Sequence, residues 1–594
     1  MHLLFTPDQI RAAEAPMLAA CEAAGDPDRL MRQAAHGLVV HIARAVTRRP
    51  ALGEPIVPAP TSVAEIYSGG IGAGTGYSPA AGYSPVSSLR GALIVGLIGP
   101  GNNGGDGLYA LAGLARRGAL CVAVMVADRW HERAAAAARD AGVELLVTQA
   151  GRPLVTVSER ASRWQLFARA AQAAGVERVV TQAGGPLPVT LEEVEVWALL
   201  RKADVIVDAV LGIGAQGGMW IPGWDEETQK WAVVGDELKA LVIAVDCPSG
   251  LNTLTGSADE LVPSAHLTVT FGALKRGLVV GAGREKTGDV YLVEMGLKTT
   301  LSSGPMPLLV TPQEADAQLL GPRAGDHKYS RGVLGVLAGS PAYPGAAVLC
   351  STAAAAVGQH DAGRGGVGML VTAGRGETGA SVVQALPEVV NVDRAELLSS
   401  AWPAAAQKAT AWVVGPGIGT EPEDCEPAVA VMKHSQCPVV VDASAFPLWE
   451  PESLLASRGD GTPIKAVNRD YVLTPHVGEF EALTQRLRVP TADPLQDPLE
   501  AAYDLASAVN AVVILKGSAT VVAAPDGPVF VAASAAPTLA RAGSGDKLAG
   551  VVGAMLATHA ARALSSGIEL LQDRIAELCA AAAVLHGLTY SIDS

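Results

Sequence analysis

One stretch near the end of the chain joins a glycine turn to an acidic residue. Residues 538–550 read Thr-Leu-Ala-Arg-Ala-Gly-Ser-Gly-Asp-Lys-Leu-Ala-Gly, and the apolar run 548–556 predicts a helix that starts just after the turn. The free N–H groups of Gly543–Gly545 and the helix dipole favour an anion. Asp546 would repel that anion, unless it takes a proton from a hydroxyl while the turn stabilises a transferring phosphoryl group. The turn alone leaves a second role open for Asp546, as an ordinary N-terminal helix cap.

A second glycine-rich segment lies nearer the start of the chain. Between a predicted strand at 93–99 and a predicted helix at 108–117, the residues read Pro-Gly-Asn-Asn-Gly-Gly-Asp-Gly. Its glycines favour close approach of the backbone to a ligand, and the helix N-terminus favours phosphate. The spacing is not Gly-x-Gly-x-x-Gly, so dinucleotide binding in the dehydrogenase manner is not expected. The side-chain oxygens of Asn102, Asn103 and Asp106 suit a hard cation or hydroxyl groups.

Two further apolar runs end in an aspartate. One ends at Asp208 and continues as Ala-Val-Leu-Gly-Ile-Gly, and the other ends at Asp246 and continues as Cys-Pro-Ser-Gly. Ligands of open parallel sheets bind beyond the carboxyl ends of the strands, so we expect Asn103, Asp208, Asp246 and Ser249 to converge. Each aspartate alone fits a loop cap, whereas three polar strand ends together favour a site.

Length and composition limit the class of protein. A chain of 594 residues with 49% hydrophobic residues fits several globular α/β domains. The 44 Lys and Arg against 59 Asp and Glu give a net charge of −15, the wrong sign for nucleic acid or an anionic membrane. The sequence lacks a long apolar span and a signal-peptide pattern, and its 7 cysteines form no Cys-x-x-Cys pair. We expect a cytoplasmic protein.

Strand and helix patterns alternate twice along the chain. Apolar runs predict parallel strands at 92–98, 119–127, 204–210 and 241–246, and again at 333–338, 411–415, 438–442 and 512–516. We therefore expect α/β domains over 1–300 and 326–594, joined by a proline-rich linker over 301–325.

Two irregularities interrupt the first predicted domain. Residues 50–88 are rich in Gly, Pro and Ser and predict a flexible insertion. Residues 141–151 recur almost unchanged at 174–184, which indicates a local duplication over 141–190. Two copies are too few for a solenoid.

The motifs of the first half resemble the YjeF N-terminal family, the NAD(P)H-hydrate epimerases. They are Gly-Asn-Asn-Gly-Gly-Asp-Gly, Val-Asp-Ala-Val-Leu-Gly-Ile-Gly, Asp-Cys-Pro-Ser-Gly and Thr-Val-Thr-Phe-Gly-Ala-Leu-Lys, the last ending at Lys275. The resemblance implies a Rossmann-like three-layer domain that interconverts the R and S epimers of hydrated NAD(P)H, abbreviated NAD(P)HX. It implies a potassium ion held by Asn103, Asp208 and Ser249, and we expect Asp208 to be the base. The implied hydrate-binding residues are Asn102, Asn103, Gly104, Gly105, Asp106, Gly212, Ile213, Gly214, Ala215, Gln216, Gly217, Gly218 and Asp246.

The second half resembles the ribokinase-like superfamily, specifically the ADP/ATP-dependent NAD(P)H-hydrate dehydratases. Its motifs are Gly-Ser-Pro-Ala-Tyr-Pro-Gly-Ala-Ala, Val-Val-Gly-Pro-Gly-Ile-Gly, Leu-Thr-Pro-His-Val-Gly-Glu, Val-Ile-Leu-Lys-Gly-Ser-Ala-Thr and the Gly-Ser-Gly-Asp turn. The resemblance implies a three-layer α/β domain in which Asp546 deprotonates the C6 hydroxyl of the S hydrate. That oxygen receives the nucleotide phosphoryl group and then leaves as phosphate, which restores NAD(P)H.

The second resemblance also implies binding residues and cofactors. ADP or ATP is the expected co-substrate, with Mg²⁺ near Glu479, in addition to K⁺ in the first domain. The residues implied for the hydrate are Ala346, Gly417 or Gly419, His476 and Asp546. The residues implied for the nucleotide are Lys516, Gly517, Ser518, Ala519, Thr520, Gly543, Ser544 and Gly545.

Three segments depart from the dehydratase pattern. Asp-Ala-Ser-Ala-Phe at 442–446 replaces the usual Asp-Ala-Asp-Ala-Leu, and Arg541 replaces a small polar residue. Lys547 stands where an apolar residue is common, and we expect it either to lower the pKa of Asp546 or to pair with nucleotide phosphates.

Three functions are compatible with these motifs. The leading hypothesis is one bifunctional enzyme that epimerises and dehydrates NADHX and NADPHX, with ADP as co-substrate, as a homo-oligomer without nucleic-acid or membrane partners. The first alternative is a kinase of a small alcohol or vitamin precursor with a regulatory N-terminal domain. The second is a non-catalytic ligand-binding or scaffold protein.

Overall fold

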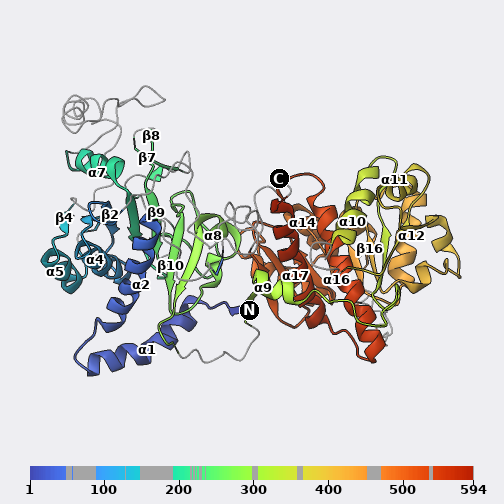
Figure 1. Cartoon of the computed structure of the whole chain (residues 1–594), viewed down its shortest axis with the longest axis horizontal. Coiled ribbons are helices and arrows are strands. Elements are labelled where there is room, and N and C mark those ends of the chain that lie inside the picture. Colours follow the sequence, from blue (N-terminus) through green and yellow to red (C-terminus); the bar gives the residue numbers. More distant parts are fainter. Residues whose placement is uncertain are drawn as a thin grey trace. The chain divides into compact units, whose positions relative to one another are not determined.

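The described chain forms two compact units, Leu4–Leu301 and Ser302–Ser594, and Met1–Leu3 belong to the second (Figure 1). The computed structural model describes residues 1–47, 56–57, 88–127, 129–147, 191–214, 217, 221, 224–225, 230–233, 236–297, 306–357, 366–450, 470–533 and 539–592. Each unit has a mainly parallel sheet with helices, so the predicted α/β class is confirmed in both.

A seven-stranded sheet organises the first unit, in the order β11-β10-β9-β5-β2-β3-β4 with every pair parallel. Its strands are β2 (Leu93–Ile98), β3 (Leu120–Met125), β4 (Glu144–Val147), β5 (Val205–Ala209), β9 (Leu241–Val245), β10 (Leu267–Phe271) and β11 (Asp289–Val293). The helices are α1 (Pro7–Ala23), α2 (Arg29–Val46), α4 (Asn102–Ala115), α5 (Glu132–Asp140), α7 (Leu191–Lys202), the 3-10 turn η2 (Arg276–Leu278) and α8 (Gly281–Lys286). A small antiparallel sheet contains β6 (Trp224–Asp225), β7 (Lys230–Val233) and β8 (Asp236–Glu237).

Apolar side chains on both faces of this sheet explain its three layers. Successive residues of a strand point to opposite faces, so a strand covered on both sides reads as a continuous apolar run. On β2, Ile94 and Ile98 belong to the core that contains α2, α4 and α5. Val95 and Leu97 belong to a separate core with residues of α7.

An eleven-stranded sheet organises the second unit, in the order β1-β12-β21-β20-β19-β18-β17-β16-β13-β14-β15. From β19 to β15 along this order, every neighbouring pair of strands is parallel. Strand β20 is antiparallel to both of its neighbours, β19 and β21. The strands are β1 (His2–Leu3), β12 (Leu308–Leu309), β13 (Val333–Leu337), β14 (Met369–Ala373), β15 (Val390–Val392), β16 (Ala411–Val414), β17 (Val439–Val441), β18 (Tyr471–Leu473), β19 (Val512–Leu515), β20 (Thr520–Ala523) and β21 (Val529–Ala532).

Helices cover both faces of the second sheet. Helix α16 packs against α10, α17 and the central strands. Because crossovers between parallel strands are almost always right-handed, the reversal of strand order at β13 places α12, α14 and α15 on the face opposite α10. The helices are α9 (Pro312–Ala317), α10 (Pro344–Ala356), α11 (Glu377–Ala385), α12 (Pro422–His434), α14 (Val477–Leu487), α15 (Pro498–Val509), α16 (Ser544–Ser566) and α17 (Gln572–Ile592), with 3-10 turns η3 (Arg394–Leu398), η4 (Ala406–Lys408) and η5 (Ala443–Leu448).

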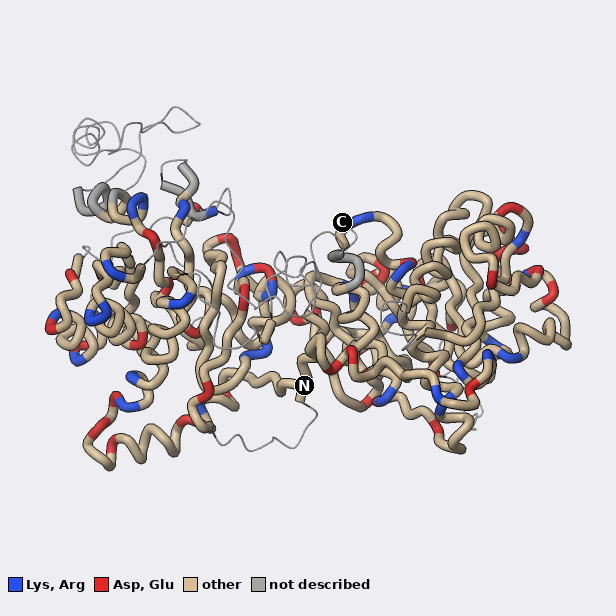
Figure 2. The backbone as a smooth tube through the Cα atoms, in the orientation of Figure 1, with Lys and Arg blue, Asp and Glu red and all other residues tan. Residues whose placement is uncertain are grey.

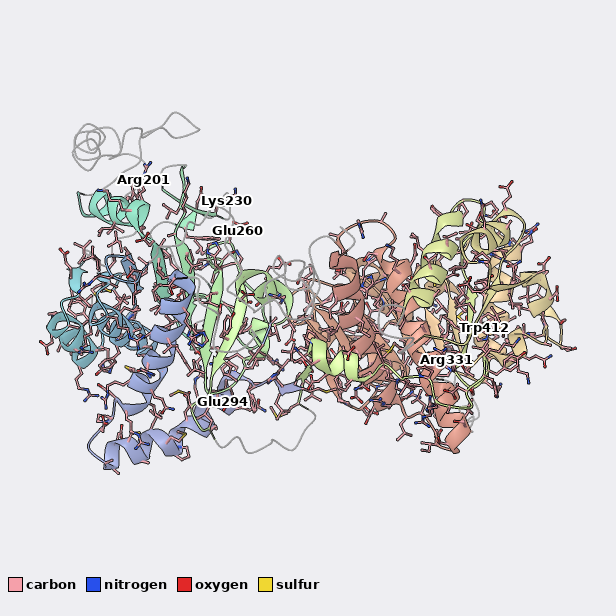
Figure 3. All side chains as sticks on the ribbon, viewed as in Figure 1. Arg201, Lys230, Glu260, Glu294, Arg331 and Trp412 are labelled. Carbon is pink, nitrogen blue, oxygen red and sulfur yellow. The ribbon has the colours of Figure 1, made fainter. Side chains whose placement is uncertain are left out.

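Helix α16 is the central helix of this unit. A Cβ on its Gly550 would lie 2.1 Å from the Cys350 carbonyl oxygen of α10, and one on Gly553 would lie 2.5 Å from Val413 of β16. In the described part of the chain it is the one helix long and apolar enough to cross a membrane, and 78% of that stretch is buried inside the structure. Close packing also occurs in the sheet, where Trp412 of β16 (labelled in Figure 3) covers Gly335 of β13.

Charged residues of both signs are interspersed along the described chain of each unit (Figure 2). In the residues that the structure describes, neither sign of charge is therefore concentrated in one segment (Figure 2).

Several sequence expectations differ from the structure. The predicted linker 301–325 contains β12 and α9, which pack in the second unit, and β1 pairs antiparallel with β12. A Thr311–Glu314 capping box and a proline at the first helical position explain why α9 forms in a proline-rich segment. The insertion at 50–88 lies outside the described residues except for 56–57 and 88, and of the duplication at 141–190 only 141–147 is described.

Candidate functional site

The first candidate site lies at the centre of the seven-stranded sheet. Strand order reverses between β2 and β5, and an open parallel sheet has its crevice at such a point, beyond the carboxyl ends of the strands. Asn103 follows β2, Asp208 lies in β5, and Asp246 and Ser249 follow β9, which adjoins β5. The structure thus brings these four predicted residues to one edge of the sheet.

Buried oxygens gather around Ser249. Its hydroxyl donates to Asp208 Oδ1 at 2.5 Å and accepts from the Leu211 N–H at 2.8 Å, and its N–H donates to Asp208 Oδ2 at 2.9 Å. The Asn103 amide donates to the Leu211 carbonyl oxygen at 3.0 Å. Asn103 Oδ1 is buried and has no hydrogen-bond partner in the described structure. Buried acceptors in proteins almost always have a partner, so this oxygen suits a cation, a water molecule or a donor from a ligand.

Asp208 is enclosed within this cluster of buried oxygens. It is 1% exposed, and burial raises its pKa against the opposing effect of the hydrogen bonds from Ser249. A carboxylate with both oxygens held by protein donors suits an ion ligand better than a base that must meet a substrate hydroxyl. The expectation that Asp208 is the base is therefore not favoured by this geometry.

Asp246 is held in an unusual backbone conformation. Its φ is 66°, a left-handed value that is rare for residues other than glycine and is concentrated at functional sites. Its carboxylate accepts from Thr270 Oγ1 and from the Phe271 N–H, each at 3.1 Å, and from the buried ammonium of Lys275.

Two further carboxyl groups face this ion pair. Asp106 is half-buried on α4, and burial together with Asp246 and Glu14 raises its pKa well above its usual range, while Lys275 opposes that change. Burial and Asp246 also raise the pKa of Glu14 on α1, while Lys275 and Arg11 lower it.

The glycines of the Asn102–Gly107 segment serve packing more than ligand approach. A Cβ at Gly104 would lie 2.2 Å from the Gly99 carbonyl oxygen, and one at Gly105 would lie 2.5 Å from Met31 Sδ. Helix α4 begins at Asn102 with Gly101 as N-cap, and not at 108 as the sequence suggested. These glycines bring α4 close to β2 and α2, which keeps the free N–H groups of its first turn beside the site.

The second predicted loop is described only in part. A Cβ at Gly212 would lie 3.2 Å from Asn103 Cβ, so this glycine borders the cluster of buried oxygens. The Ile213 carbonyl oxygen accepts from Arg11 at 3.1 Å, and Gly214 is next to the same guanidinium. Gly217 is next to Asp259, whereas Ala215, Gln216 and Gly218 lie outside the described residues.

The second candidate site lies at the carboxyl ends of β17, β18 and β19, which are adjacent and parallel. Asp442, Thr474 and Lys516 follow these strands. The buried Asp442 carboxylate accepts from Thr474 Oγ1 and from Lys516 Nζ, the latter at 3.1 Å. Lys516 Nζ is also 3.5 Å from Glu479 Oε2. Burial disfavours the charged form of Lys516 and acts to lower its pKa, but the carboxylates of Asp442 and Glu479 outweigh this effect, so the pKa is raised.

Asp546 lies in the first turn of α16. The helix begins at Ser544 with Gly543 as N-cap, so it starts four residues earlier than the apolar run indicated, and Asp546 is not its cap. Burial and the Asp442 carboxylate raise the pKa of Asp546, and Lys516 lowers it. A Cβ on Gly545 would lie 3.4 Å from Lys516 Nζ, so the lysine ammonium faces the glycine turn.

Lys547 is not among the groups that shift the pKa of Asp546, and its other expected role, pairing with nucleotide phosphates, stays a prediction. The cation that lowers the pKa of Asp546 is Lys516, which directly follows β19. Lys547, Arg541 and Lys516 all oppose protonation of His586 on α17, whose pKa is lowered mainly by burial to about 4. The two basic departures from the family pattern, Arg541 and Lys547, therefore add positive charge near His586.

His476 and Glu479 form the cap of α14. The His476 ring accepts from the Glu479 N–H at 3.2 Å, and the Glu479 carboxylate accepts from the His476 N–H at 2.9 Å. The His476 side chain is 60% exposed, so its ring faces solvent beside the site.

The structure distinguishes between the two glycines predicted for the hydrate. A Cβ on Gly417 would lie 2.5 Å from Ala346 Cβ, whereas one on Gly419 would lie 2.2 Å from Asp424 Oδ2. Asp424 is bound to the buried Arg394 at 2.6 Å. Gly417 therefore lies with Ala346, and Gly419 packs against an internal ion pair.

The predicted nucleotide segment turns from β19 into β20. Lys516 directly follows β19, Gly517 and Ser518 lie in the turn, Ala519 is buried just before β20, and Thr520 is buried as its first residue. The antiparallel return keeps this turn on the Lys516 side of the site.

Sequence reasoning missed several side chains at these sites. Asp442 follows an apolar strand, as Asp208 and Asp246 do, but the sequence alone assigns it no role. Lys275 was noted only as the last residue of a motif. Glu14 precedes the other residues of its site by some 90 positions, and no local pattern marks it.

Two protein families match the two units. The family described as YjeF-related protein N-terminus matches residues 27–277. The family described as NAD(P)H-hydrate dehydratase matches residues 334–589.

Relatives match across both units. The bifunctional NAD(P)H-hydrate repair enzyme Nnr of Mycobacterium tuberculosis is 34% identical over 562 residues, which cover 94% of this chain and 90% of that protein. The enzyme of the same name from Mycobacterium leprae is 34% identical over 474 residues, 79% of each chain. Among solved structures, an ADP/ATP-dependent NAD(P)H-hydrate dehydratase from Bacillus subtilis, co-crystallised with ATP/Mg²⁺, is 26% identical with a TM-score of 0.37, covering 48% of this chain and 88% of that chain. Since one relative aligns over nearly its whole length and both family matches fall on the two units, the chain belongs to the family of bifunctional NAD(P)H-hydrate repair enzymes.

Proposed function

We propose that the first unit epimerises NADHX and NADPHX at C6, and that the second dehydrates the S epimer at the expense of ADP or ATP. The observation that carries this proposal is the presence in one chain of two separate clusters with different chemistry. The first has buried oxygens with one orphaned acceptor, Asn103 Oδ1. The second has a carboxyl group, Asp546, at a helix N-terminus faced by Lys516.

A potassium ion suits the first cluster. Asn103 Oδ1 lacks a partner in the described structure, and Asp208, Ser249 and the Leu211 carbonyl supply further oxygens. Hard cations take oxygen ligands of these kinds. When bound, the ion would neutralise the buried Asp208 and fix the position of the hydrate next to α4. We assign to the hydrate the neighbouring Gly212–Gly218 loop and Asp246.

Asp546 is the proposed base of the second site. It takes the proton of the C6 hydroxyl, and that oxygen forms a bond to the terminal phosphoryl group of the nucleotide. The bond between this phosphorus and the nucleotide breaks. Phosphate then leaves from C6 and a proton leaves from C5, which restores the C5–C6 double bond of NAD(P)H. The N–H groups of Ser544 and Gly545 stabilise the transferring charge.

The residues around Lys516 suit a nucleotide with magnesium. The Lys516 ammonium faces the glycine turn, and its positive charge suits binding of the phosphates of ADP or ATP. Glu479 and Asp442 are the carboxylates available to Mg²⁺, and Mg²⁺ usually binds one or two carboxylates, phosphates and water. When bound, this ion would neutralise charge on the phosphates. Ala346, Gly417 and His476 are the proposed contacts to the hydrate.

The cellular setting is part of the same proposal. The net charge of −15 supports small-molecule substrates over nucleic acid or an anionic membrane. We place the enzyme in the cytoplasm as a homo-oligomer, and light scattering on the purified chain tests the oligomeric state.

Replacement of Asp546 tests the two-site assignment. Asp546→Asn is expected to lower dehydration by about 10²–10⁴-fold, the usual contribution of a general base, and to leave epimerisation unchanged. Asp573→Asn, the same change in the first turn of α17, is the control. Loss of both activities in Asp546→Asn would contradict separate sites. A stable phosphorylated product from the wild-type protein would indicate a kinase.

A further inference from the structure

Helix α1 is tied to both sides of the first site. A capping box between Thr6 and Gln9 starts the helix. Just before it, the Phe5 N–H donates to the Leu274 carbonyl oxygen at 2.9 Å, and Phe5 pairs in register with Lys275. One turn into the helix, Arg11 donates to the Ile213 carbonyl oxygen at 3.1 Å.

These two contacts orient the inner face of α1. Residues three and four apart lie on the same face of a helix, so Glu14 shares a face with Arg11 and with Ile10, which is fully buried. Glu14 is half-buried, and its carboxyl group has no hydrogen bond or ion pair within the described structure. Helix α1 is therefore held beside Lys275, the partner of Asp246, and beside the Ile213 carbonyl oxygen, and Glu14 lies one turn beyond Arg11 on the same face.

We propose that Glu14 is a proton-exchanging residue of the epimerase site and that its partner is Asp106. This inference rests on the proposed epimerase function. It extends the site to a helix that precedes every motif from which the site was identified.

The electrostatic surroundings support this pairing. Lys275 is committed to Asp246, Thr270 and Phe271 through hydrogen bonds, so it does not neutralise every carboxylate around it. Burial, Asp246 and the Glu14 charge raise the pKa of Asp106, and burial and Asp246 raise the pKa of Glu14. Two such groups share protons readily, with one acting as acid while the other acts as base.

A second observation indicates that a ligand enters this crevice. Asn103 belongs to the same first turn of α4 as Asp106, is 6% exposed, and has an unpartnered Oδ1. Asp246, with its left-handed backbone conformation, lies at the same edge of the sheet.

The pairing supplies both proton transfers that epimerisation needs. One carboxylate takes the proton of the C6 hydroxyl, the C6–N1 bond breaks with its electron pair going to N1, and C6 becomes an aldehyde. The other carboxyl group donates its proton to N1. After rotation about the C5–C6 bond, the reverse steps close the ring on the other face of C6. No net proton, electron or water is consumed.

Glu14→Gln tests the proposal, because it keeps the shape of the side chain and removes the acid. We expect the epimerisation kcat to fall by about 10²–10⁴-fold, the KM to change little, and one limb of its pH profile to disappear. The groups that face Glu14 are Arg11, Lys275, Asp246 and Asp106, and all four remain in this variant. Glu22→Gln, at the exposed end of α1, is the matched control.

Three further measurements separate the possible outcomes. Dehydration of the pure S epimer is expected to be unchanged in Glu14→Gln, which checks that the protein is folded and active. Glu14→Asp is expected to recover part of the lost kcat, as an acid–base role requires and a packing role does not. Wild-type epimerisation in Glu14→Gln would overturn the role of Glu14. No epimerisation by the wild-type protein would instead overturn the proposed function on which it rests.

Discussion

Adding one methyl group at Gly543 should lower the dehydration activity of a protein that still folds. It caps α16 with φ at 86°, a left-handed conformation that glycine adopts without cost. The N–H groups of Ser544 and Gly545, which follow it, are the proposed donors to the phosphoryl group. Gly543→Ala therefore disturbs the backbone that orients these donors.

The cost of this change follows from its two components. A Cβ in the left-handed region costs about 1–2 kcal/mol. The added Cβ would also lie 2.5 Å from Leu349 Cδ1, the far end of a half-buried side chain that can turn away, so this contact adds about 1 kcal/mol. The second unit should lose about 2–3 kcal/mol of unfolding free energy. If the turn rotates to relieve the strain, displaced donors should lower kcat by about 10²–10³-fold.

Gly567→Ala is the matched control. Gly567 caps the other end of α16 with φ at 65°, and a Cβ there meets nothing within 4 Å. It should lose about 1–2 kcal/mol of stability and retain kcat. The assay is NADH recovery from S-NADHX with ADP and Mg²⁺, together with urea unfolding of each variant. A Gly543→Ala enzyme with the kcat of the control would refute the role of the turn.

Three other changes have expected outcomes. Asp442→Asn removes a charge that raises the pKa of Asp546, so the acidic limb of the dehydration pH profile should move to lower pH; an unmoved limb contradicts the coupling. Asn103→Ala removes an orphaned buried oxygen, so stabilisation of the first unit by KCl over NaCl should disappear, and an unchanged difference in Tm contradicts a potassium site there. Burial lowers the pKa of His41 from 6.5 to about 4, so the unfolded state takes up this proton first as the pH falls, and about 3 kcal/mol of stability should be lost between these values. His41→Phe should flatten that dependence in urea titrations at about pH 7 and about pH 5, and an equally steep loss in this variant would contradict the assignment.

The central strands could be predicted because they are buried on both faces. Runs such as 92–98 and 204–210 are apolar at nearly every position, and β2 and β5 occupy them. Strand β10 was not predicted, since Thr268 and Thr270 interrupt its apolar pattern. Both threonines are buried and hydrogen-bonded, with Thr270 donating to Asp246, so tertiary contacts compensate for their polarity.

The starts of the two key helices were placed too late for a common reason. Both α4 and α16 begin inside glycine-rich segments, which resemble loops because glycine has low helix propensity. The structure uses the missing side chains for close packing, as at Gly104 against the Gly99 carbonyl oxygen. Propensity alone does not reveal such a contact.

The candidate sites could be predicted only where one motif contains the chemistry. Asp546 and Asn103 lie in motifs that indicate a role by themselves, and both lie at strand or helix ends as expected. The surroundings of these residues depend on distant segments. Asp442 affects Asp546 from over 100 positions away, and Glu14 affects Asp106 across some 90. A single sequence contains no signal for these pairs.

The most direct test of two cooperating sites starts from the pure R epimer of NADHX. With ADP and Mg²⁺, the wild-type chain should convert all of it to NADH, since the first site supplies the S epimer that the second consumes. Asp546→Asn should form the S epimer and stop there. Recovery of NADH from the S epimer alone, with the R epimer left untouched, would contradict the account.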